Sequence, residues 1–180
     1  RAVAREPKLL SIEERSVALD LGAPEEERIV FRDGVSERDT SHPHAHRCVE
    51  VRAAWVQARI AYRYGVSDEF TCALDTLADA AGVCRDFAHV GIALCRGLSI
   101  PARMVVGYLY QLEPMDLHAW FEAFVGGRWY TFDATQSQPR GGRIVLAYGR
   151  DAADVAIAST YGPLTTVELK VWVHLDNRHR

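Results

Sequence analysis

Apolar residues recur at helical spacing in two parts of the chain. In residues 48–64 the apolar positions that share one face are Val49, Ala53, Val56 and Ile60. In residues 84–97 the corresponding positions are Phe87, Val90 and Leu94. Spacing of three and four residues places side chains on one side of a helix, so both stretches predict amphipathic helices. A shorter helix is expected at residues 73–81. Thr71 or Cys72 would cap its start, and Gly82 would end it in a left-handed conformation.

Other stretches have the alternation or the β-branched composition of strands. Residues 99–110 form an apolar run that follows the second long helix, and residues 144–147 form a shorter run. Residues 164–175 alternate between apolar and polar positions, which predicts a half-buried strand that closes a sheet. Two weaker strands are expected around residues 17–21 and 29–31, joined by an acidic loop. The sequence therefore predicts a mixed α+β fold.

Gly126-Gly127 lies between two runs of aromatic and β-branched residues, which is a strong signal for a hairpin. With a two-residue loop, Phe124 faces Trp129 and Trp120 faces Asp133. His118 then lies on the same sheet face as Trp120, diagonal to Asp133. Diagonal neighbours lie about 7–8 Å apart at the backbone, which an imidazole and a carboxylate can bridge. The register therefore predicts a His–Asp pair.

Cys84 falls at the start of the helix over residues 84–97. Unpaired N–H groups and the positive end of the helix dipole favour an anion there, and the thiolate is the nucleophilic form of cysteine. The alternative is a small buried hydrophobic residue, which is what most free cysteines are. Asp86 would disfavour the thiolate unless a cation such as Arg85 or Arg103 pairs with it. The backbone N–H of Cys84 is a candidate oxyanion-hole donor.

Three separated motifs resemble the transglutaminase-like superfamily in its bacterial branch. They are GVCRDFAHVGIALCRGLSIPARMVVGYL around Cys84, HAW at His118 and FDAT around Asp133. The resemblance implies a papain-like fold, in which the cysteine-bearing helix packs on an antiparallel β-sheet. It also implies a thiol triad of Cys84, His118 and Asp133. Many members of this branch resemble peptidases or amidases.

Length and composition suit one domain with a sizeable core, since the chain has 180 residues of which 48% are hydrophobic. We expect a transglutaminase-like domain over residues 47–180. Residues 1–46 would supply strands and a connector, either as the remainder of a preceding β domain or as an extra edge of the sheet. The net charge of −3 and dispersed arginines argue against a nucleic-acid partner. No apolar run is long enough to span a bilayer, and the cysteines suggest a reducing, cytoplasmic setting.

A second cluster of reactive side chains comprises His42, His44, His46 and Cys48. If extended, these alternate residues would share one face, and imidazole with thiolate suits zinc. A single strand rarely supplies a closed tetrahedral site, so a His-rich connector leading into a helix is the preferred interpretation. We expect no cofactor.

The function that these residues predict is thiol-dependent acyl transfer. Cys84 would attack an amide or ester carbonyl, His118 would move the proton, and Asp133 would orient the imidazole. Hydrolysis of a peptide or protein substrate is the expected outcome. Three alternatives stay open: cross-linking of glutamine to lysine, an inactive relative that binds a peptide, and a metal-dependent protein.

Overall fold

The computed structural model describes residues 43–138, 140–156, 165 and 169–174, and all of them belong to the unit Glu37–Arg180. Its helices are α2 (Pro43–Arg59), α3 (Ala73–Asp79) and α4 (Cys84–Gly97). Two short strands, β1 (Ala61–Tyr62) and β2 (Ala81–Gly82), pair in parallel. A second sheet contains β3 (Ala102–Leu109), β4 (His118–Val125), β5 (Arg128–Phe132) and β6 (Arg143–Gly149). None of the described helices is long and apolar enough to cross a membrane.

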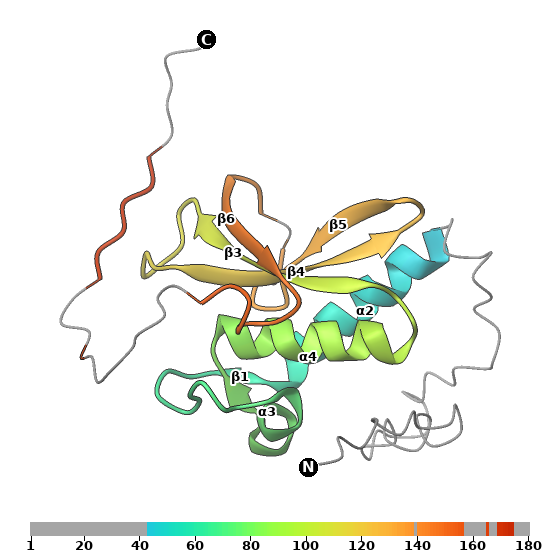
Figure 1. Cartoon of the computed structure of the whole chain (residues 1–180), viewed down its shortest axis with the longest axis horizontal. Helices are drawn as coiled ribbons and strands as arrows, with labels where there is room; N and C mark the ends of the chain where they lie inside the picture. Colours follow the sequence, from blue (N-terminus) through green and yellow to red (C-terminus); the bar gives the residue numbers. More distant parts are fainter. Residues whose placement is uncertain (1–42, 139, 157–164, 166–168, 175–180) are drawn as a thin grey trace, which may run out of the picture. The chain divides into compact units, whose positions relative to one another are not determined.

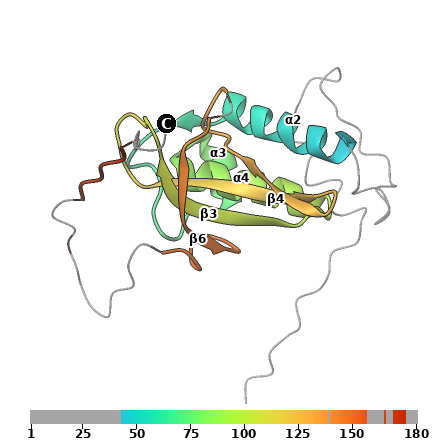
Figure 2. The same cartoon turned by 90° about the horizontal axis from the view of Figure 1, so that it is seen from above.

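The four-stranded sheet is antiparallel, with the strand order β5-β4-β3-β6 (Figure 1). Helix α4 packs beneath its central strands, and α2 lies beside α4 on the same face (Figures 1 and 2). The predicted α+β class, with a cysteine-bearing helix on an antiparallel sheet, is therefore confirmed. The expected apolar face of α2 is also confirmed, because Val49 and Val56 are buried and Ala53 packs against the core. Ile60, which directly follows the helix, is buried as well.

The contact between α4 and β4 depends on a glycine. A Cβ added at Gly91 would lie 2.4 Å from a ring carbon of Phe121, so the helix could not approach the sheet this closely with a larger residue. Phe121 is fully buried and stacks on Phe132 with ring centroids 5.6 Å apart. This close packing sets the distance between α4 and the sheet, and with it the position of Cys84 relative to the sheet.

The hairpin has the predicted register. Phe124 pairs with Trp129, Val125 pairs with Arg128, and Phe121 pairs with Phe132. Gly126 and Gly127 form the two-residue loop, and both have positive φ, at 59° and 84°. A two-residue hairpin loop with positive φ at both positions follows the twist of the strands, which explains why the glycine pair occurs here.

Helix boundaries differ from the expected ones in two places. Helix α3 ends with Ala80 as its cap, in the left-handed conformation (φ 48°), so the prediction that Gly82 ends this helix is wrong. Gly82 is instead a strand residue, and a Cβ there would lie 2.7 Å from the Cβ of Asp86. The glycine is needed for the close approach of Asp86 and not for a turn. Helix α2 begins at Pro43 and ends at Arg59, about five residues earlier than expected.

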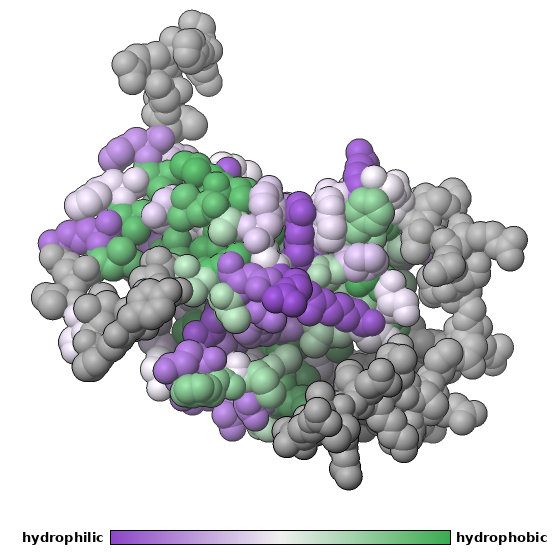
Figure 3. Space-filling model, in the orientation of Figure 1, coloured by the Kyte–Doolittle hydropathy of each residue, from purple (hydrophilic) through white to green (hydrophobic). Residues whose placement is uncertain are grey.

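The C-terminal strand prediction is wrong for the residues that the structure describes. Residue 165 and residues 169–174 have no strand structure, and the fourth strand of the sheet is β6. Leu169 and Trp172 are 55% and 71% exposed. The face shown in Figure 3 also has exposed apolar side chains over β6, namely Ile144, Val145, Leu146 and Tyr148. The alternation of apolar and polar residues therefore identified a sequence suited to a strand, but it did not show which strand would pair with it.

The strands expected at residues 17–21 and 29–31 lie outside the described residues. The domain boundary at residue 47 stays a prediction.

Candidate active site

Cys84 is the first residue of α4, directly after the extended cap residue Val83. The backbone N–H of Val83 donates to Asp86 Oδ2 over 2.8 Å, so a carboxylate in the first turn caps the N-terminus of α4. The preceding strand β2 is held by β1, since Arg63 N–H donates to the Gly82 carbonyl over 2.9 Å. The thiol therefore lies at a helix N-terminus, as the helical periodicity predicts. The capping by Asp86 and the pairing of β2 with β1 hold this N-terminus in place.

The carboxylate of Asp86 is fully buried but not unpaired. It accepts a hydrogen bond from the Ser67 hydroxyl and lies 3.2 Å from Arg85 Nε. Arg85 is thus the partner that the sequence suggested. The suggested pairing of Asp86 with Arg103 is wrong. Arg103 instead donates two hydrogen bonds to Glu122 Oε2, over 2.7 and 2.9 Å. These partners hold the negative charge of Asp86 in place within the first turn of α4.

His118 and Asp133 form a buried pair. His118 Nε2 lies 2.8 Å from Asp133 Oδ2, and their side chains are 2% and 3% exposed. The hairpin register brings them together, because His118 begins β4 and Asp133 directly follows β5. Since Nε2 is occupied by Asp133, Nδ1 is the nitrogen left to exchange a proton with a thiol or a substrate.

Two further residues hold the carboxylate of Asp133. The backbone N–H and the hydroxyl of Thr135 donate to Oδ1 over 3.1 and 2.7 Å. Arg143 Nη2 donates to Oδ2 over 3.2 Å. Sequence reasoning missed both residues. A threonine two positions after an aspartate is a recognisable turn pattern, so Thr135 could have been found. Nothing in the local sequence points to Arg143, which comes from β6.

The site favours an imidazolium at His118. Burial alone would lower its pKa, but the hydrogen bond to Asp133 and the neighbouring Cys84 raise the pKa of His118 to about 9. Burial alone would raise the pKa of Asp133, but His118 and Thr135 lower it from its ordinary value. Cys84 is therefore close enough to His118 for the two to interact, and the three predicted residues lie in one place. Their catalytic role stays a prediction.

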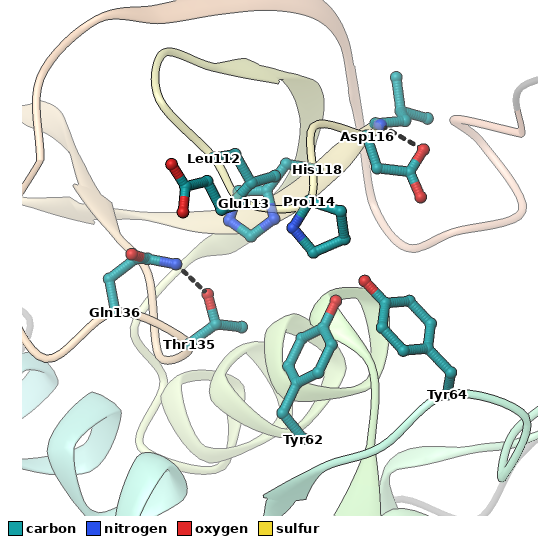
Figure 4. Close-up of a pocket in the computed structure, with 10 residues that line it drawn as sticks. Tyr62, Tyr64, Leu112, Glu113, Pro114, Asp116, His118, Thr135 and Gln136 are labelled. Atoms are coloured by element: carbon teal, nitrogen blue, oxygen red, sulfur yellow. Dashed lines mark hydrogen bonds between the residues drawn. The ribbon is translucent and has the colours of Figure 1, made fainter. Parts of the chain in front are cut away.

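A pocket of about 250 Å³ opens beside His118. Figure 4 shows that Tyr62 and Tyr64 point their hydroxyl groups from the α4 side toward the segment that carries Pro114 and His118. The remaining walls come from the loop before β4 and the turn after β5, namely Leu112, Glu113, Asp116, Leu117, Thr135 and Gln136. The pocket is large enough for a side chain or a short piece of peptide next to the reacting groups.

The His-rich tract does not have the extended arrangement that a metal site would need. His44, His46 and Cys48 all lie in α2, where alternate residues point in nearly opposite directions. His46 lies 3.5 Å from Glu50 and packs its ring edge against Tyr130. The expectation of a non-helical connector is wrong from Pro43 onward, and His42 lies outside the described residues. Among those residues, no group of three or more possible metal ligands is found.

His89 lies in a different environment. Its Nε2 accepts a hydrogen bond from the backbone N–H of Ala152 over 3.1 Å, which ties α4 to the turn after β6. Burial lowers its pKa, so it is held neutral. This is the arrangement of a structural histidine.

Comparison with known proteins agrees with this geometry. The family model of the transglutaminase-like superfamily matches residues 28–134. The chain belongs to this superfamily. A crystal structure from Cytophaga hutchinsonii, described as that of a "putative cysteine protease", is 44% identical to it with a TM-score of 0.64. The match covers 72% of this chain and 49% of that one. The fold is therefore the papain-like one that the superfamily motifs imply.

A second relative is a Mycobacterium leprae protein described as uncharacterized. It is 30% identical over 151 residues, which cover 78% of this chain and 54% of the relative. The chain thus spans about half the length of both relatives.

Proposed function

We propose that this member of the transglutaminase-like superfamily is a cysteine hydrolase that cleaves amide or peptide bonds through an acyl-enzyme. The observation that carries the proposal is the buried 2.8 Å pair of His118 and Asp133 beside Cys84 at the start of α4. A buried ion pair contributes little to stability compared with apolar packing, so its presence in a pocket wall favours a chemical role.

In the proposed reaction the Cys84 thiolate attacks the substrate carbonyl carbon, and the carbonyl π electrons move to oxygen. When the oxyanion collapses, the carbon–nitrogen bond breaks and His118 Nδ1 gives its proton to the leaving amine. Water then attacks the resulting thioester while His118 takes one of its protons. Collapse of this second intermediate releases the acid and regenerates the thiolate. Asp133 keeps Nε2 protonated throughout, so that Nδ1 is the exchanging nitrogen.

The surroundings of the site favour water as the acyl acceptor. Cross-linking requires water to be excluded from the acceptor side, for which a closed aromatic tunnel is suited. The two tryptophans of the hairpin do not line the pocket beside His118. Trp120 is buried in the sheet, and Trp129 stacks on Arg103 at 4.1 Å. Two observations favour the cross-linking alternative. Tyr62 and Tyr64 are aromatic walls of the pocket, and Glu113 and Asp116 line it and would attract a lysine ammonium.

The test is to incubate the protein with a glutamine-bearing peptide and an excess of a primary amine. Ammonia release, amine incorporation and peptide cleavage are followed separately. We expect hydrolysis to outrun incorporation and to be lost in Cys84→Ala but kept in Cys72→Ala, which removes an exposed cysteine from another part of the chain. Faster incorporation that also depends on Cys84 would overturn the hydrolase assignment and leave the triad intact.

Peptides or proteins are the proposed partners. The cytoplasm is the proposed location, since four unpaired cysteines fit a reducing compartment. Cleavage of a disulfide-free cytosolic peptide library, analysed by mass spectrometry, would identify the sequence that is preferred next to the scissile bond. If the wild-type protein and Cys84→Ala give the same products, the peptidase proposal is wrong.

A further inference from the structure

An arginine from β6 lies beside the His–Asp pair. Arg143 is the first residue of β6, and its Nη2 donates to Asp133 Oδ2 over 3.2 Å. The same oxygen lies 2.8 Å from Nε2 of His118, so one carboxylate oxygen is shared between a guanidinium and the imidazole. The Arg143 side chain is 16% exposed, and its guanidinium carbon lies 5.5 Å from the centroid of the Trp120 ring. Its positive charge is therefore held in the site, where solvent and salt screen it weakly.

A β-bulge determines on which face of the sheet Arg143 lies. The pairing of β3 with β6 is regular up to Val106, and the register shifts by one residue before Gly107. After the shift Arg143 lies opposite Leu109, whereas continued regular pairing would place it opposite Tyr110. Because successive residues of a strand point to opposite faces, a shift of one residue reverses the face. The bulge therefore moves Arg143 from one face of the sheet to the other.

The face that Arg143 reaches in this way is the face of the imidazole. Gly107 pairs with His118 in β4, and Leu109, two positions further along β3, shares its face. A Cβ at Gly107 would overlap the carbonyl oxygen of Ile144, so the glycine is needed for β6 to come this close at the bulge. Bulges next to active sites commonly redirect a side chain, and this one directs a cation to the carboxylate that holds the imidazole.

Stability alone does not explain this placement of the guanidinium. Nη1 of Arg143 donates to the Arg140 carbonyl and Nη2 to Asp133. Its Nε is buried and has no hydrogen-bond partner among the described residues. A buried donor without a partner lowers the stability of the fold. The placement therefore favours a role of Arg143 in the chemistry of the His–Asp pair.

We propose that Arg143 is a positioning residue that acts through Asp133 and limits the basicity of His118, so that the imidazolium gives its proton readily to the leaving amine. This inference rests on the proposed acyl transfer. When the tetrahedral intermediate collapses, the electron pair of the carbon–nitrogen bond goes to nitrogen, and the proton moves from His118 Nδ1 to that nitrogen. Arg143 forms no covalent bond and keeps its protons throughout.

The surroundings of His118 explain why such a residue is useful. Burial lowers the pKa of His118, but the hydrogen bond to Asp133 and the neighbouring Cys84 outweigh it and raise this pKa to about 9. An imidazolium held so firmly pairs well with a thiolate but is a weak acid toward a leaving amine. Arg143 lies two hydrogen bonds away, within about 6 Å of Nε2, and a like charge at this distance disfavours the protonated ring.

The ionisable groups around His118 come from several parts of the chain. They are Cys84 at the start of α4, Asp133 after β5, Arg143 in β6 and, along the pocket, Tyr62, Tyr64, Glu113 and Asp116. Among the described groups that donate to Asp133, Arg143 is the permanent cation. Replacement of Arg143 therefore changes one charge and leaves the other groups in place.

The experiment compares Arg143→Met with the wild-type protein. Methionine keeps an apolar stem near the Trp120 ring and removes the charge. Arg143→Lys removes the guanidinium but keeps the charge. The control is Arg128→Met, which removes an exposed arginine that packs on Tyr130 in β5. If Arg143→Met does not fold, Arg143→Gln takes its place with the same expectations, since glutamine offers Asp133 a donor without the charge.

Three quantities are measured. The pKa of His118 is followed by ¹H–¹⁵N NMR of the imidazole rings, with the signals of His89 as a reference for correct folding. The release of ammonia from a glutamine-bearing peptide requires a proton for the leaving group. The alkylation of Cys84 by iodoacetamide requires the thiolate but no proton, because iodide leaves as an anion.

We expect the pKa of His118 to rise by about 1–2 in Arg143→Met, as for the loss of a charge about 6 Å away at an effective dielectric constant of about 20. The kcat of ammonia release should fall on the order of 10-fold with KM within about twofold, because a weaker acid protonates the amine more slowly. Alkylation near pH 7 should stay within about twofold of wild type. Arg143→Lys should lie closer to the wild type in pKa and kcat, since a charge acts over several ångströms, and Arg128→Met should match the wild type.

Four results would overturn the inference. They are a pKa of His118 that stays the same or falls in Arg143→Met, an unchanged kcat, equal losses in both reactions, and a lysine variant no better than the methionine variant. Equal losses would mean that Arg143 supports the structure of the site and does not act on the proton. If the wild-type protein releases no ammonia in a Cys84-dependent reaction, the proposed acyl transfer fails, and the titration alone then tests whether Arg143 acts on His118.

Discussion

Replacement of Asp133 with asparagine tests the proposed division of roles in the triad. The substitution keeps the size of the side chain but removes its charge and one of its acceptors. Asp133 receives donors on both oxygens: His118 and Arg143 on Oδ2, and the backbone N–H and hydroxyl of Thr135 on Oδ1. An asparagine must turn its NH₂ group toward one of these sets. Either the turn at Thr135 loses its acceptor, or Nε2 of His118 must itself become an acceptor and Nδ1 must carry the proton.

The size of the effect on His118 follows from its surroundings. Its pKa of about 9 lies roughly 2.5 units above the ordinary value of 6.5, which corresponds to about 3 kcal/mol in favour of the imidazolium. An opposite charge at hydrogen-bond distance changes a pKa by about 1–3. Burial, which favours the neutral ring, stays in the variant. We therefore expect the pKa of His118 to fall by about 1–3 units in Asp133→Asn.

The sign of the pH dependence follows directly. Because the folded pKa of His118 is raised, the imidazolium and the stability that it contributes are present below about pH 6.5 and are lost as the pH rises through about 9. In the variant this loss should occur at lower pH. Hydrolysis of an amide should also fall, on the order of 10⁴-fold, because the leaving amine needs a proton from the correct nitrogen.

Two-dimensional ¹H–¹⁵N NMR of the imidazole rings measures both the pKa and the tautomer. The His118 signals are assigned by their absence in His118→Gln, and Asp79→Asn serves as the control, since it neutralises an exposed carboxylate at the end of α3. The reasoning is refuted if His118 of the wild-type protein titrates near pH 6.5. It is equally refuted if Asp133→Asn leaves the titration and the tautomer unchanged.

Two further predictions concern the position and the reactivity of the nucleophile. Gly91→Ala should lower the free energy of unfolding by about 1–2 kcal/mol, because the overpacking against a buried ring outweighs the gain in helix propensity. Gly97→Ala, where a Cβ would meet nothing within 4 Å, should be neutral or slightly stabilising in the same urea titration. Iodoacetamide near neutral pH should label Cys84 faster than Cys72, although Cys72 is the more exposed, and His118→Ala should slow the labelling. Faster labelling of Cys72 would contradict the assignment of the nucleophile.

Features that depend on local spacing were predictable from the sequence alone. The apolar period in residues 84–97 predicted α4 and put Cys84 at its first residue. The glycine pair at residues 126 and 127 specified the hairpin loop, and the register then followed by counting residues. His118 and Asp133 are only 15 positions apart within that hairpin, so their pairing was implied by the register. In each case the interacting groups are close in sequence, and local backbone geometry decides the outcome.

Tertiary packing decided everything that joins distant segments. Arg143 reaches Asp133 because β6 lies beside β3, and Tyr62 reaches the start of α4 because β1 pairs with β2. Neither contact is indicated by the spacing of residues or by the composition of the sequence. The alternation in residues 164–175 shows that a strand-like sequence does not by itself predict a strand. A strand exists only when a neighbour supplies hydrogen bonds, and the sequence of one strand does not say which neighbour that is. The sequence thus determined the helix that begins at Cys84 and the His–Asp hairpin, and the three-dimensional packing determined which other residues surround them.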